Sequence, residues 1–170
     1  MTSRDGTALV IRLLHSEEQE KVRLLLARCS LASLRYRFLH PIKFLSESDF
    51  QHLTAQNCAQ CATFAVVPEP DNADAPIVAL GQYQALGDRP HVAEVSFLVE
   101  DAMQRQGIGT ALLGALVFLA RQHGITHFSA DVLTDNQLML AVFRHAGFAL
   151  HASTSYGVTH LEFPITDDEA

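Results

Sequence analysis

The residues best suited to chemistry lie in a short glycine-containing turn that follows an apolar strand. The segment Gln104–Gly109 (QRQGIG) comes after the apolar run His91–Val99 and opens a long apolar helix. Glycine lets the backbone approach a ligand closely, and the first turn of a helix leaves several N–H groups without partners. Such N–H groups favour a pyrophosphate, to which Arg105 adds a positive charge. The turn therefore predicts a site for an anionic ligand.

Two common nucleotide-binding motifs do not describe this turn. Leu112 stands where the third glycine of a dinucleotide-binding fingerprint would be, and no Gly-Lys-Ser/Thr follows as in a P-loop. A pair of glycines also occurs in turns that only permit tight packing. Both interpretations, ligand approach and close packing, remain open from these residues alone.

A single acid, Glu94, interrupts the otherwise apolar strand that precedes the turn. Alternation along the strand predicts that Glu94, Ser96 and Leu98 share one face. A carboxylate that is partly buried in an apolar strand can have a raised pKa, which suits it to accept a proton near neutral pH. Glu94 is our candidate general base; the alternative is a solvated acid that hydrogen-bonds to a neighbour.

The elements that must position these residues follow from hydrophobic periodicity and from turn residues. The second half of the chain runs β-α-β-α-β-β, and a strand–helix–strand crossover implies parallel pairing. We therefore expect an α/β (α+β) fold, a mixed central sheet of about six to seven strands flanked by about four helices. Strands are expected at Ala8–Leu14, Ala62–Val67, Ile77–Leu86, His91–Val99, Ile125–Leu133, Phe148–Ala152 and Thr159–Pro164. Helices are expected from Ser16, between Ser30 and Gln56 with a break near Pro41 and a new start at Ser46, from Ile108 to Gly124, and over Asn136–His145.

The composition is that of one ordinary domain, expected over residues 1–170 with a core of about 8–164. The chain has 48% hydrophobic residues and a net charge of −7, which makes it a poor candidate for nucleic acid and suits a cationic partner. The apolar run Ala111–Ala120 is too short to cross a membrane, and the N-terminus lacks the apolar stretch of a signal peptide. We expect a cytoplasmic protein, monomeric or homodimeric.

The three cysteines do not predict a disulfide framework or a metal site. Cys58 and Cys61 form a C-x-x-C, but zinc needs two more ligands and only His40 and His52 are near in sequence. The sequence contains no H-E-x-x-H and no G-x-S-x-G, so a metallopeptidase or hydrolase has little support. We expect reduced thiols and no metal.

Two motifs together resemble those of the GNAT acyltransferase family. Gln104–Gly109 is similar to its pyrophosphate motif, and Asn136 followed by the pair Gly147–Phe148 is similar to its second motif. A closer resemblance is to the Pat-type protein lysine acetyltransferases, through Ser33–Phe38 (SLRYRF) and Val132–Leu140 (VLTDNQLML). The resemblance extends from about residue 8 to residue 164.

The resemblance implies an acetyl-CoA-dependent N-acetyltransferase that needs no metal. A primary amine, with a protein lysine as the favoured acceptor, would attack acetyl-CoA directly in a ternary complex, with Glu94 as general base. Two alternatives stay open, a small-molecule amine N-acetyltransferase and a weakly catalytic acyl-CoA-binding regulatory module.

The resemblance also implies which residues bind the donor. The backbone of Phe97, Leu98 and Val99 would pair with the pantetheine arm as an added strand, and one of these N–H groups would polarise the thioester carbonyl. The other implied cofactor-binding residues are Gln104, Arg105, Gln106, Gly107, Ile108, Gly109, Thr110 and Asn136.

Phe143 stands where many GNAT enzymes have a tyrosine that protonates the leaving thiolate, and phenylalanine has no proton to donate. Tyr36, Tyr83 and Tyr156 remain as possible donors, with half-buried packing as the alternative for each. The resemblance makes four residues candidates for contact with the acceptor, again with packing as the alternative. They are Tyr36, Arg37, Phe38 and Tyr83.

Overall fold

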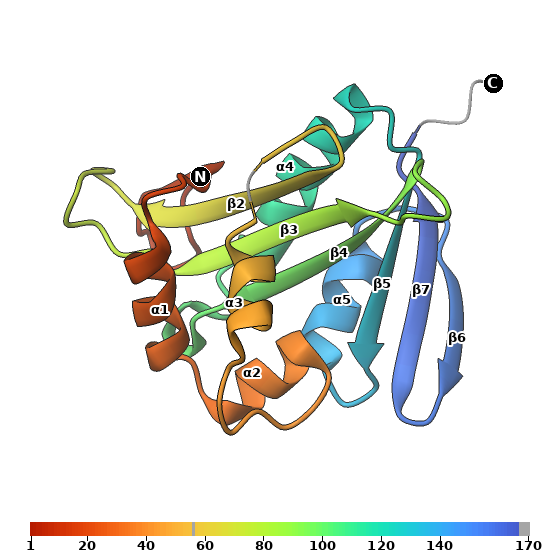
Figure 1. The fold of residues 1–170 in the computed structure, drawn as a ribbon, viewed down its shortest axis with the longest axis horizontal. Coiled ribbons are helices and arrows are strands. Elements are labelled where there is room, and N and C mark those ends of the chain that lie inside the picture. Colours follow the sequence, from red (N-terminus) through yellow and green to blue (C-terminus); the bar gives the residue numbers. More distant parts are fainter. Residues whose placement is uncertain (56, 167–170) are drawn as a thin grey trace.

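One seven-stranded mixed sheet organises the computed structural model, which describes residues 1–55 and 57–166 (Figure 1). The strand order is β1-β2-β3-β4-β5-β7-β6, and every neighbouring pair is antiparallel except β4 and β5. The strands are β1 (Leu9–Leu13), β2 (Cys61–Pro68), β3 (Ala79–Ala85), β4 (Val92–Val99), β5 (His127–Leu133), β6 (His151–Ser155) and β7 (Val158–Pro164). The expected mixed sheet is confirmed.

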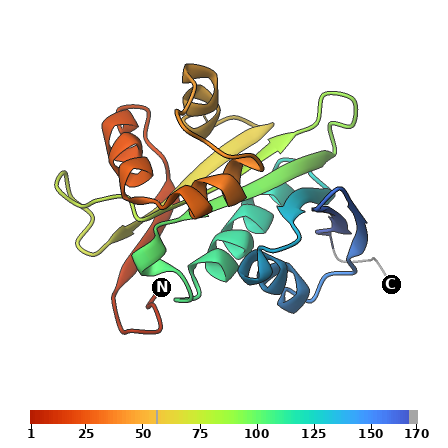
Figure 2. The ribbon, with the colours of Figure 1, turned by 90° about the horizontal axis from the view of Figure 1, so that it is seen from below.

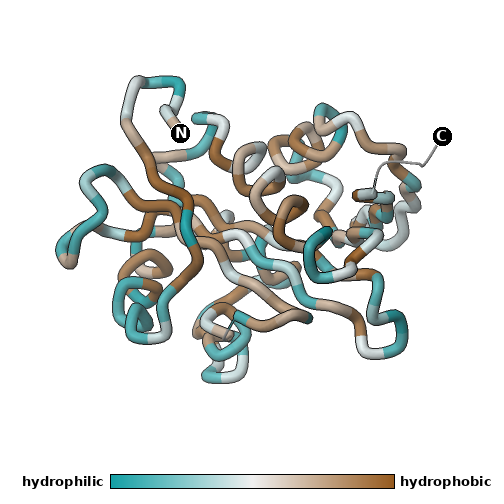
Figure 3. Tube along the Cα trace, turned by 90° about the horizontal axis from the view of Figure 1, so that it is seen from above, coloured by the Kyte–Doolittle hydropathy of each residue, from teal (hydrophilic) through white to brown (hydrophobic). Residues whose placement is uncertain are grey.

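Helices cover both faces of the sheet (Figure 2). One face carries α1 (Gln19–Arg28), α2 (Leu31–Phe38) and α3 (Glu47–Leu53), and the other carries α4 (Ile108–Gln122) and α5 (Gln137–His145). Apolar residues gather in the central strands and the inward helix faces, while the outer loops are hydrophilic (Figure 3). Two buried apolar clusters therefore hold the layers together, one on each side of the sheet.

The helix starts show where local signals decide and where they do not. Ser46 begins α3 as expected, because its hydroxyl accepts from the Asp49 N–H (3.0 Å) while the Asp49 carboxylate accepts from the Ser46 N–H (3.3 Å). The expected start of a helix at Ser16 was wrong, since α1 begins at Gln19. The carboxylate of Glu18 accepts from Arg12 (2.7 Å) and from the His15 N–H (2.9 Å), which holds the preceding residues in a turn.

The expected bounds of the strand near the C-terminus were also wrong. The strand β6 spans His151–Ser155 instead of Phe148–Ala152, because Phe148 stacks on Phe163 in the core at 5.1 Å between ring centroids. The hairpin that joins β6 to β7 turns at Tyr156 and Gly157, both of which have positive φ (51° and 77°). This turn sets the register of the pair.

Strands β4 and β5 separate, and this separation positions the site. They pair only where Val92–Glu94 lies beside His127–Ser129, whereas β5 pairs with β7 as far as Leu133. Figure 1 shows the two strands close at one end and apart at the other. Within the described chain, β4 therefore has no strand partner on this side beyond Glu94.

The backbone of β4 offers hydrogen-bonding groups to the gap. The Glu100 N–H donates to the Val78 carbonyl (2.9 Å), on the β3 side of the strand. Because the direction alternates from residue to residue in an antiparallel pair, Phe97 and Val99 turn their N–H and C=O groups to the opposite side. Leu98 turns its backbone toward β3, so only two of the three residues expected to pair with the donor present their backbone to the gap.

Candidate active site

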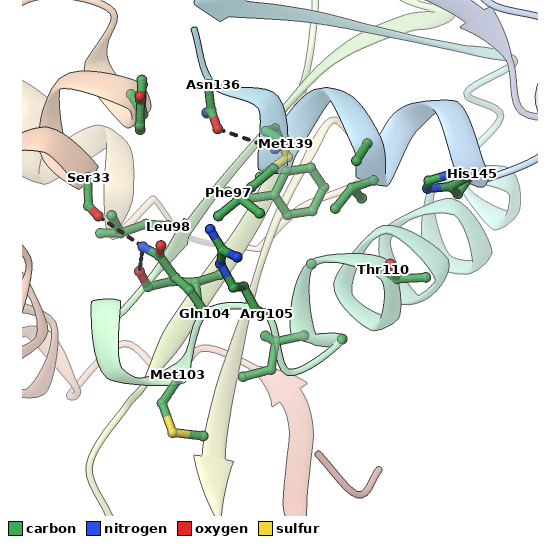
Figure 4. Close-up of a pocket in the computed structure, with 18 of the residues that line it drawn as sticks. Ser33, Phe97, Leu98, Met103, Gln104, Arg105, Thr110, Asn136, Met139 and His145 are labelled. Carbon is green, nitrogen blue, oxygen red and sulfur yellow. Dashed lines mark hydrogen bonds between the residues drawn. The ribbon is translucent and has the colours of Figure 1, made fainter. Parts of the chain in front are cut away.

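A cleft of about 250 Å³ opens where β4 and β5 separate. Its walls are the end of β4, the glycine turn, the first turn of α4 and one face of α5 (Figure 4). All of the expected cofactor-binding residues except Gln106 line it. These residues are Phe97, Leu98, Val99, Gln104, Arg105, Gly107, Ile108, Gly109, Thr110 and Asn136. We call this cavity the donor cleft.

The two glycines of the turn have different roles. Gly107 precedes α4 with a φ of +84°, a conformation that favours glycine, and a Cβ built there would meet nothing within 4 Å. A Cβ on Gly109 would lie 3.3 Å from Cγ2 of Val142 on α5. Close packing against α5 is therefore one reason for a glycine at position 109. Gly107 instead keeps the backbone at the helix start open to the cleft. No described side chain caps α4, so its first N–H groups are available to an anion.

The ionisable side chains of the donor cleft are all cationic or neutral. Arg4, Arg105 and His145 line it, and no aspartate or glutamate of the described residues does so. Figure 4 shows Arg105 extending from the turn into the cleft. In a chain with a net charge of −7, this lining makes the cleft a place for an anionic ligand.

Gln106 acts away from the cleft. Its side-chain oxygen accepts a hydrogen bond from the Asp5 N–H (3.0 Å), which ties the N-terminal loop to the glycine turn. Arg4 comes from this loop, and nothing in the local sequence connects it with the turn. Gln106 thus positions a neighbouring residue of the cleft.

A second cavity, of about 60 Å³, adjoins the donor cleft and is called here the acceptor cavity. Its lining includes Glu94 and Arg37 from one side of the sheet and Val132 and Phe143 from the other, so it passes between β4 and β5. Four residues line both cavities and mark the junction where the two meet. They are Tyr36, Phe97, Asn136 and Met139.

Glu94 lies at the last position where β4 pairs with β5, and its side chain is exposed. The partial burial expected from the sequence was wrong, because the sheet at this point is left uncovered. Arg37 lines the same cavity and donates to the side-chain oxygen of Gln82 (3.2 Å). Burial lowers the pKa of Arg37 to about 10, opposed by the negative charges of Glu94 and Asp49. The guanidinium that Gln82 holds and the Glu94 carboxylate therefore line the same cavity.

The loop before α5 closes the junction from one side. The Tyr36 hydroxyl donates to the Asp135 carbonyl (3.4 Å), and Arg35 pairs with the Asp135 carboxylate (3.2 Å). The side-chain oxygen of Asn136 accepts from the Met139 N–H (3.2 Å) and begins α5 (Figure 4). Helix α2 and the start of α5 are therefore held together above the gap.

Two residues proposed for acceptor contact lie elsewhere. Tyr83 is fully buried in the core, where its hydroxyl bonds to the His123 ring (2.7 Å) and burial raises its pKa to about 12. It cannot touch an acceptor, so that expectation was wrong. Phe38 packs against the apolar cluster beneath α1–α3, outside both cavities. Tyr36 and Arg37 remain, and Phe143 packs between Phe97 and Phe163 as a core residue.

Sequence reasoning missed several lining residues. The donor cleft also contains Arg4, Ser33, Met103, Leu138, Met139, Ala141, Val142 and His145, and the acceptor cavity contains Leu39, Val95, Ser96, Ala130, Asp131 and Val132. The sequence did contain one pattern from which four of these residues could have been identified. Positions 138, 141, 142 and 145 have the i, i+3, i+4, i+7 spacing of a single helix face, the face that α5 turns to the cleft.

Other kinds of site find no support in the described part of the chain. It holds no group of three or more His, Cys, Asp or Glu side chains that could bind a metal ion. None of its helices is long and apolar enough to cross a membrane.

Comparisons with known proteins agree with this arrangement. The sequence matches the Acetyltransferase (GNAT) family over residues 27–148. It is 31% identical over 140 residues to the Acetyltransferase Pat of Mycolicibacterium smegmatis (strain ATCC 700084 / mc(2)155). That match covers 75% of this chain and 42% of the relative, so this chain spans less than half of that protein's length.

Solved structures show the same fold. The GNAT domain of S. lividans PAT superposes with a TM-score of 0.84 at 30% identity, covering 96% of this chain and 94% of that chain. The structure of yncA from Salmonella typhimurium with its cofactor acetyl-CoA has a TM-score of 0.72 at 15% identity, covers 96% of this chain and 97% of that chain, and supports the fold alone. The chain belongs to the GNAT family of acetyltransferases, enzymes whose acyl donor is acetyl-CoA.

Proposed function

We propose that this protein transfers the acetyl group of acetyl-CoA to the side-chain amine of a protein lysine, by direct attack in a ternary complex. The observation that carries the proposal is the junction of the two cavities. A cleft with cationic side chains suits the donor, and an adjoining cavity with a carboxylate suits the amine. At the junction, amine and thioester can come within reacting distance without a covalent enzyme intermediate.

The residues of the donor cleft fit acetyl-CoA. Phe97 and Val99 turn backbone groups to the gap, where an extended pantetheine arm can pair with them as a strand would. The uncapped start of α4 and the side chains of Arg4 and Arg105 suit the phosphates. The Phe97 N–H, at the junction, is our candidate to polarise the thioester carbonyl.

Glu94 is the proposed general base. An amine acceptor is protonated at neutral pH and must lose a proton before or during attack. Glu94 lies in the acceptor cavity, and its exposed carboxylate can take that proton directly or through one water. Arg37 lines the same cavity and adds a positive charge there.

Tyr36 is the proposed donor to the leaving thiolate. When the C–S bond breaks, the electron pair goes to sulfur, which then takes a proton or a hydrogen bond. Of the three tyrosines, Tyr36 lines the junction, Tyr83 is buried against His123, and Tyr156 is exposed in the β6–β7 turn. Tyr36 thereby takes the place that Phe143 cannot fill.

A protein lysine is the favoured acceptor for two reasons. The acceptor cavity, at about 60 Å³, suits the narrow unbranched end of a lysine side chain, and the exposed position of Glu94 is open to a macromolecule. The segments Ser33–Phe38 and Val132–Leu140 also resemble the Pat-type enzymes. A small-molecule amine is the second candidate, because nothing in the cavity requires a polypeptide backbone.

Mass spectrometry tests the proposal. Purified protein is incubated with isotopically labelled acetyl-CoA and a pool of proteins. In a separate reaction, the protein pool is replaced by a pool of small amines. Labelled lysines in a defined set of proteins would support the proposal, and labelled small amines alone would replace it with the second candidate. Tight acetyl-CoA binding without any product would indicate a binding module.

A further inference from the structure

Two cysteines lie side by side in the turn that leads into β2. The sulfur atoms of Cys58 and Cys61 are 2.7 Å apart. The Cys58 N–H donates to the Cys61 carbonyl (2.8 Å), and the Cys61 N–H donates to the Cys58 carbonyl (3.3 Å). Residues that exchange both bonds have Cα atoms about 5.5 Å apart, which is within the range that a disulfide spans. The backbone therefore already holds the geometry that an S–S bond needs.

The two thiols have different environments. Cys58 is exposed, whereas Cys61 is half-buried at the start of the strand. The hydrogen bond with Cys61 lowers the pKa of Cys58, while burial raises the pKa of Cys61 to about 11. Cys58 is thus the sulfur that oxidants meet first, and Cys61 is held beside it as a second thiol.

The third cysteine provides an internal reference. Cys29 ends α1, is half-buried, and has a pKa raised to about 12, chiefly by burial and then by the negative charges of Asp101 and Glu100. A thiol in this environment reacts slowly with oxidants and alkylating agents.

We propose that Cys58 and Cys61 form a reversible redox pair that is oxidised by hydroperoxides. The Cys58 thiolate attacks one oxygen of hydrogen peroxide, the O–O bond breaks, and hydroxide leaves and is protonated to water. The resulting sulfenic acid is attacked by the sulfur of Cys61, the S–S bond forms, and the sulfenic oxygen leaves as a second water with the thiol proton. Two thiols lose two electrons and two protons to one peroxide. Two molecules of a low-molecular-weight thiol restore the pair by exchange: the first forms a mixed disulfide with one cysteine, and the second releases that cysteine and leaves as the oxidised thiol disulfide.

The pair lies on the side of the sheet that carries Glu94. Cys61 pairs with Gln84, and Gln84 pairs with Glu94, so the three side chains share one face across β2, β3 and β4. Neither cysteine lines the donor cleft or the acceptor cavity. Oxidation is therefore separable from donor binding, and the affinity for acetyl-CoA serves as a check that the oxidised protein is intact.

The test is peroxide treatment of the whole protein, followed by alkylation, digestion and mass spectrometry. We expect the peptide that contains Cys58 and Cys61 to lose two hydrogens and to escape alkylation, and we expect dithiothreitol to reverse this oxidation fully. Cys29 should remain a thiol and become alkylated. Cys29→Ser should leave this result unchanged. In Cys61→Ser, Cys58 should instead be trapped as a sulfenic acid by dimedone.

Two outcomes would overturn the proposal. One is oxidation of Cys58 to sulfinic acid in the unaltered protein while Cys61 stays open to alkylation. The other is equal oxidation of Cys29 and Cys58, which would mean that the paired geometry has no effect. Neither outcome bears on acetyl transfer, so the redox proposal and the proposed function fail or hold independently.

Discussion

The side-chain amide of Gln104 donates a hydrogen bond to the hydroxyl of Ser33 across 2.9 Å. The same amide group also donates to the Val99 carbonyl (3.2 Å). One side chain therefore joins α2, the end of β4 and the glycine turn, three of the elements around the donor cleft (Figure 4).

Ser33→Ala should loosen this connection. Ser33 is buried, and loss of a buried hydrogen bond typically costs about 1 kcal/mol of unfolding free energy. We expect a lower Tm and a higher KM for acetyl-CoA, measured by thermal unfolding and steady-state kinetics. Ser153→Ala, on the exposed strand β6, is the control that should change neither. An unchanged KM in Ser33→Ala would show that the connection does not shape the cleft.

Gly109→Val should weaken acetyl-CoA binding while the protein stays folded. The new side chain presses on Val142, 3.3 Å from the added Cβ, and blocks close approach to the backbone of the turn. Gly114→Ala is the matched control within α4, since its Cβ meets nothing within 4 Å and a helix-interior alanine stabilises by roughly 0.5–1 kcal/mol. Calorimetry measures the affinity of each variant for acetyl-CoA. Equal affinity in both variants would show that the turn does not bind the pyrophosphate.

Arg4→Ala should raise the KM for acetyl-CoA several-fold and leave kcat unchanged. Arg4 adds charge to a cleft that holds no acid among the described residues, and its contribution should shrink as salt screens it. Arg144→Ala, an exposed arginine outside the cleft lining, is the control. A KM that does not respond to Arg4→Ala at low salt would contradict a phosphate contact.

Glu94→Gln should lower the turnover rate by about 10²–10⁴-fold near neutral pH, the range of a general base, with little change in acetyl-CoA affinity. The loss should shrink at high pH, where more of the amine is already neutral. Glu162→Gln is the control, a carboxylate on the same sheet face that pairs with Arg89 (3.0 Å). The turnover rate of all three proteins is measured over a series of pH values. Equal rates in wild type and Glu94→Gln would show that Glu94 is not the general base.

Tyr36→Phe should lower kcat by about 10–100-fold, the equivalent of a lost hydrogen bond to a charged atom, and change KM little. The loss should be smaller with acetyl-seleno-CoA, because a selenolate leaves without needing a proton. Tyr156→Phe, in the exposed hairpin turn, should behave like wild type. The same loss with both donors would mean that the Tyr36 hydroxyl acts through its hydrogen bond to the Asp135 carbonyl (3.4 Å) and not on the leaving sulfur.

Local signals in the sequence determined most of the elements. Alternation marked β4 and its lone acid, helical periodicity marked α4 and α5, and Ser46 with Asp49 marked the start of α3. These features depend on residues within one turn or one strand, so they are visible without the fold. The glycine turn also belongs to this group, since its backbone requirement is local.

Contacts between distant residues decided the rest. Arg12 of β1 binds Glu18, so that α1 begins at Gln19 and not at Ser16. The turn at Tyr156 and Gly157 places β6 later in the sequence than expected. Packing against α4 buried Tyr83, and the Asp5–Gln106 bond joins residues 101 positions apart to bring Arg4 to the cleft. Such pairings carry no local signal, because each depends on the path of the whole chain.

The same limit applies to the junction of the two cavities. The strand–helix–strand order predicts that β4 and β5 pair in parallel. Where they part depends on β5 taking β7 as its partner along its whole length while β4 stays with β3. Strand twist and register set that point, and both belong to the assembled sheet. The sequence by itself determined a glycine turn, an acid and a family resemblance; only the tertiary structure brought them to one gap.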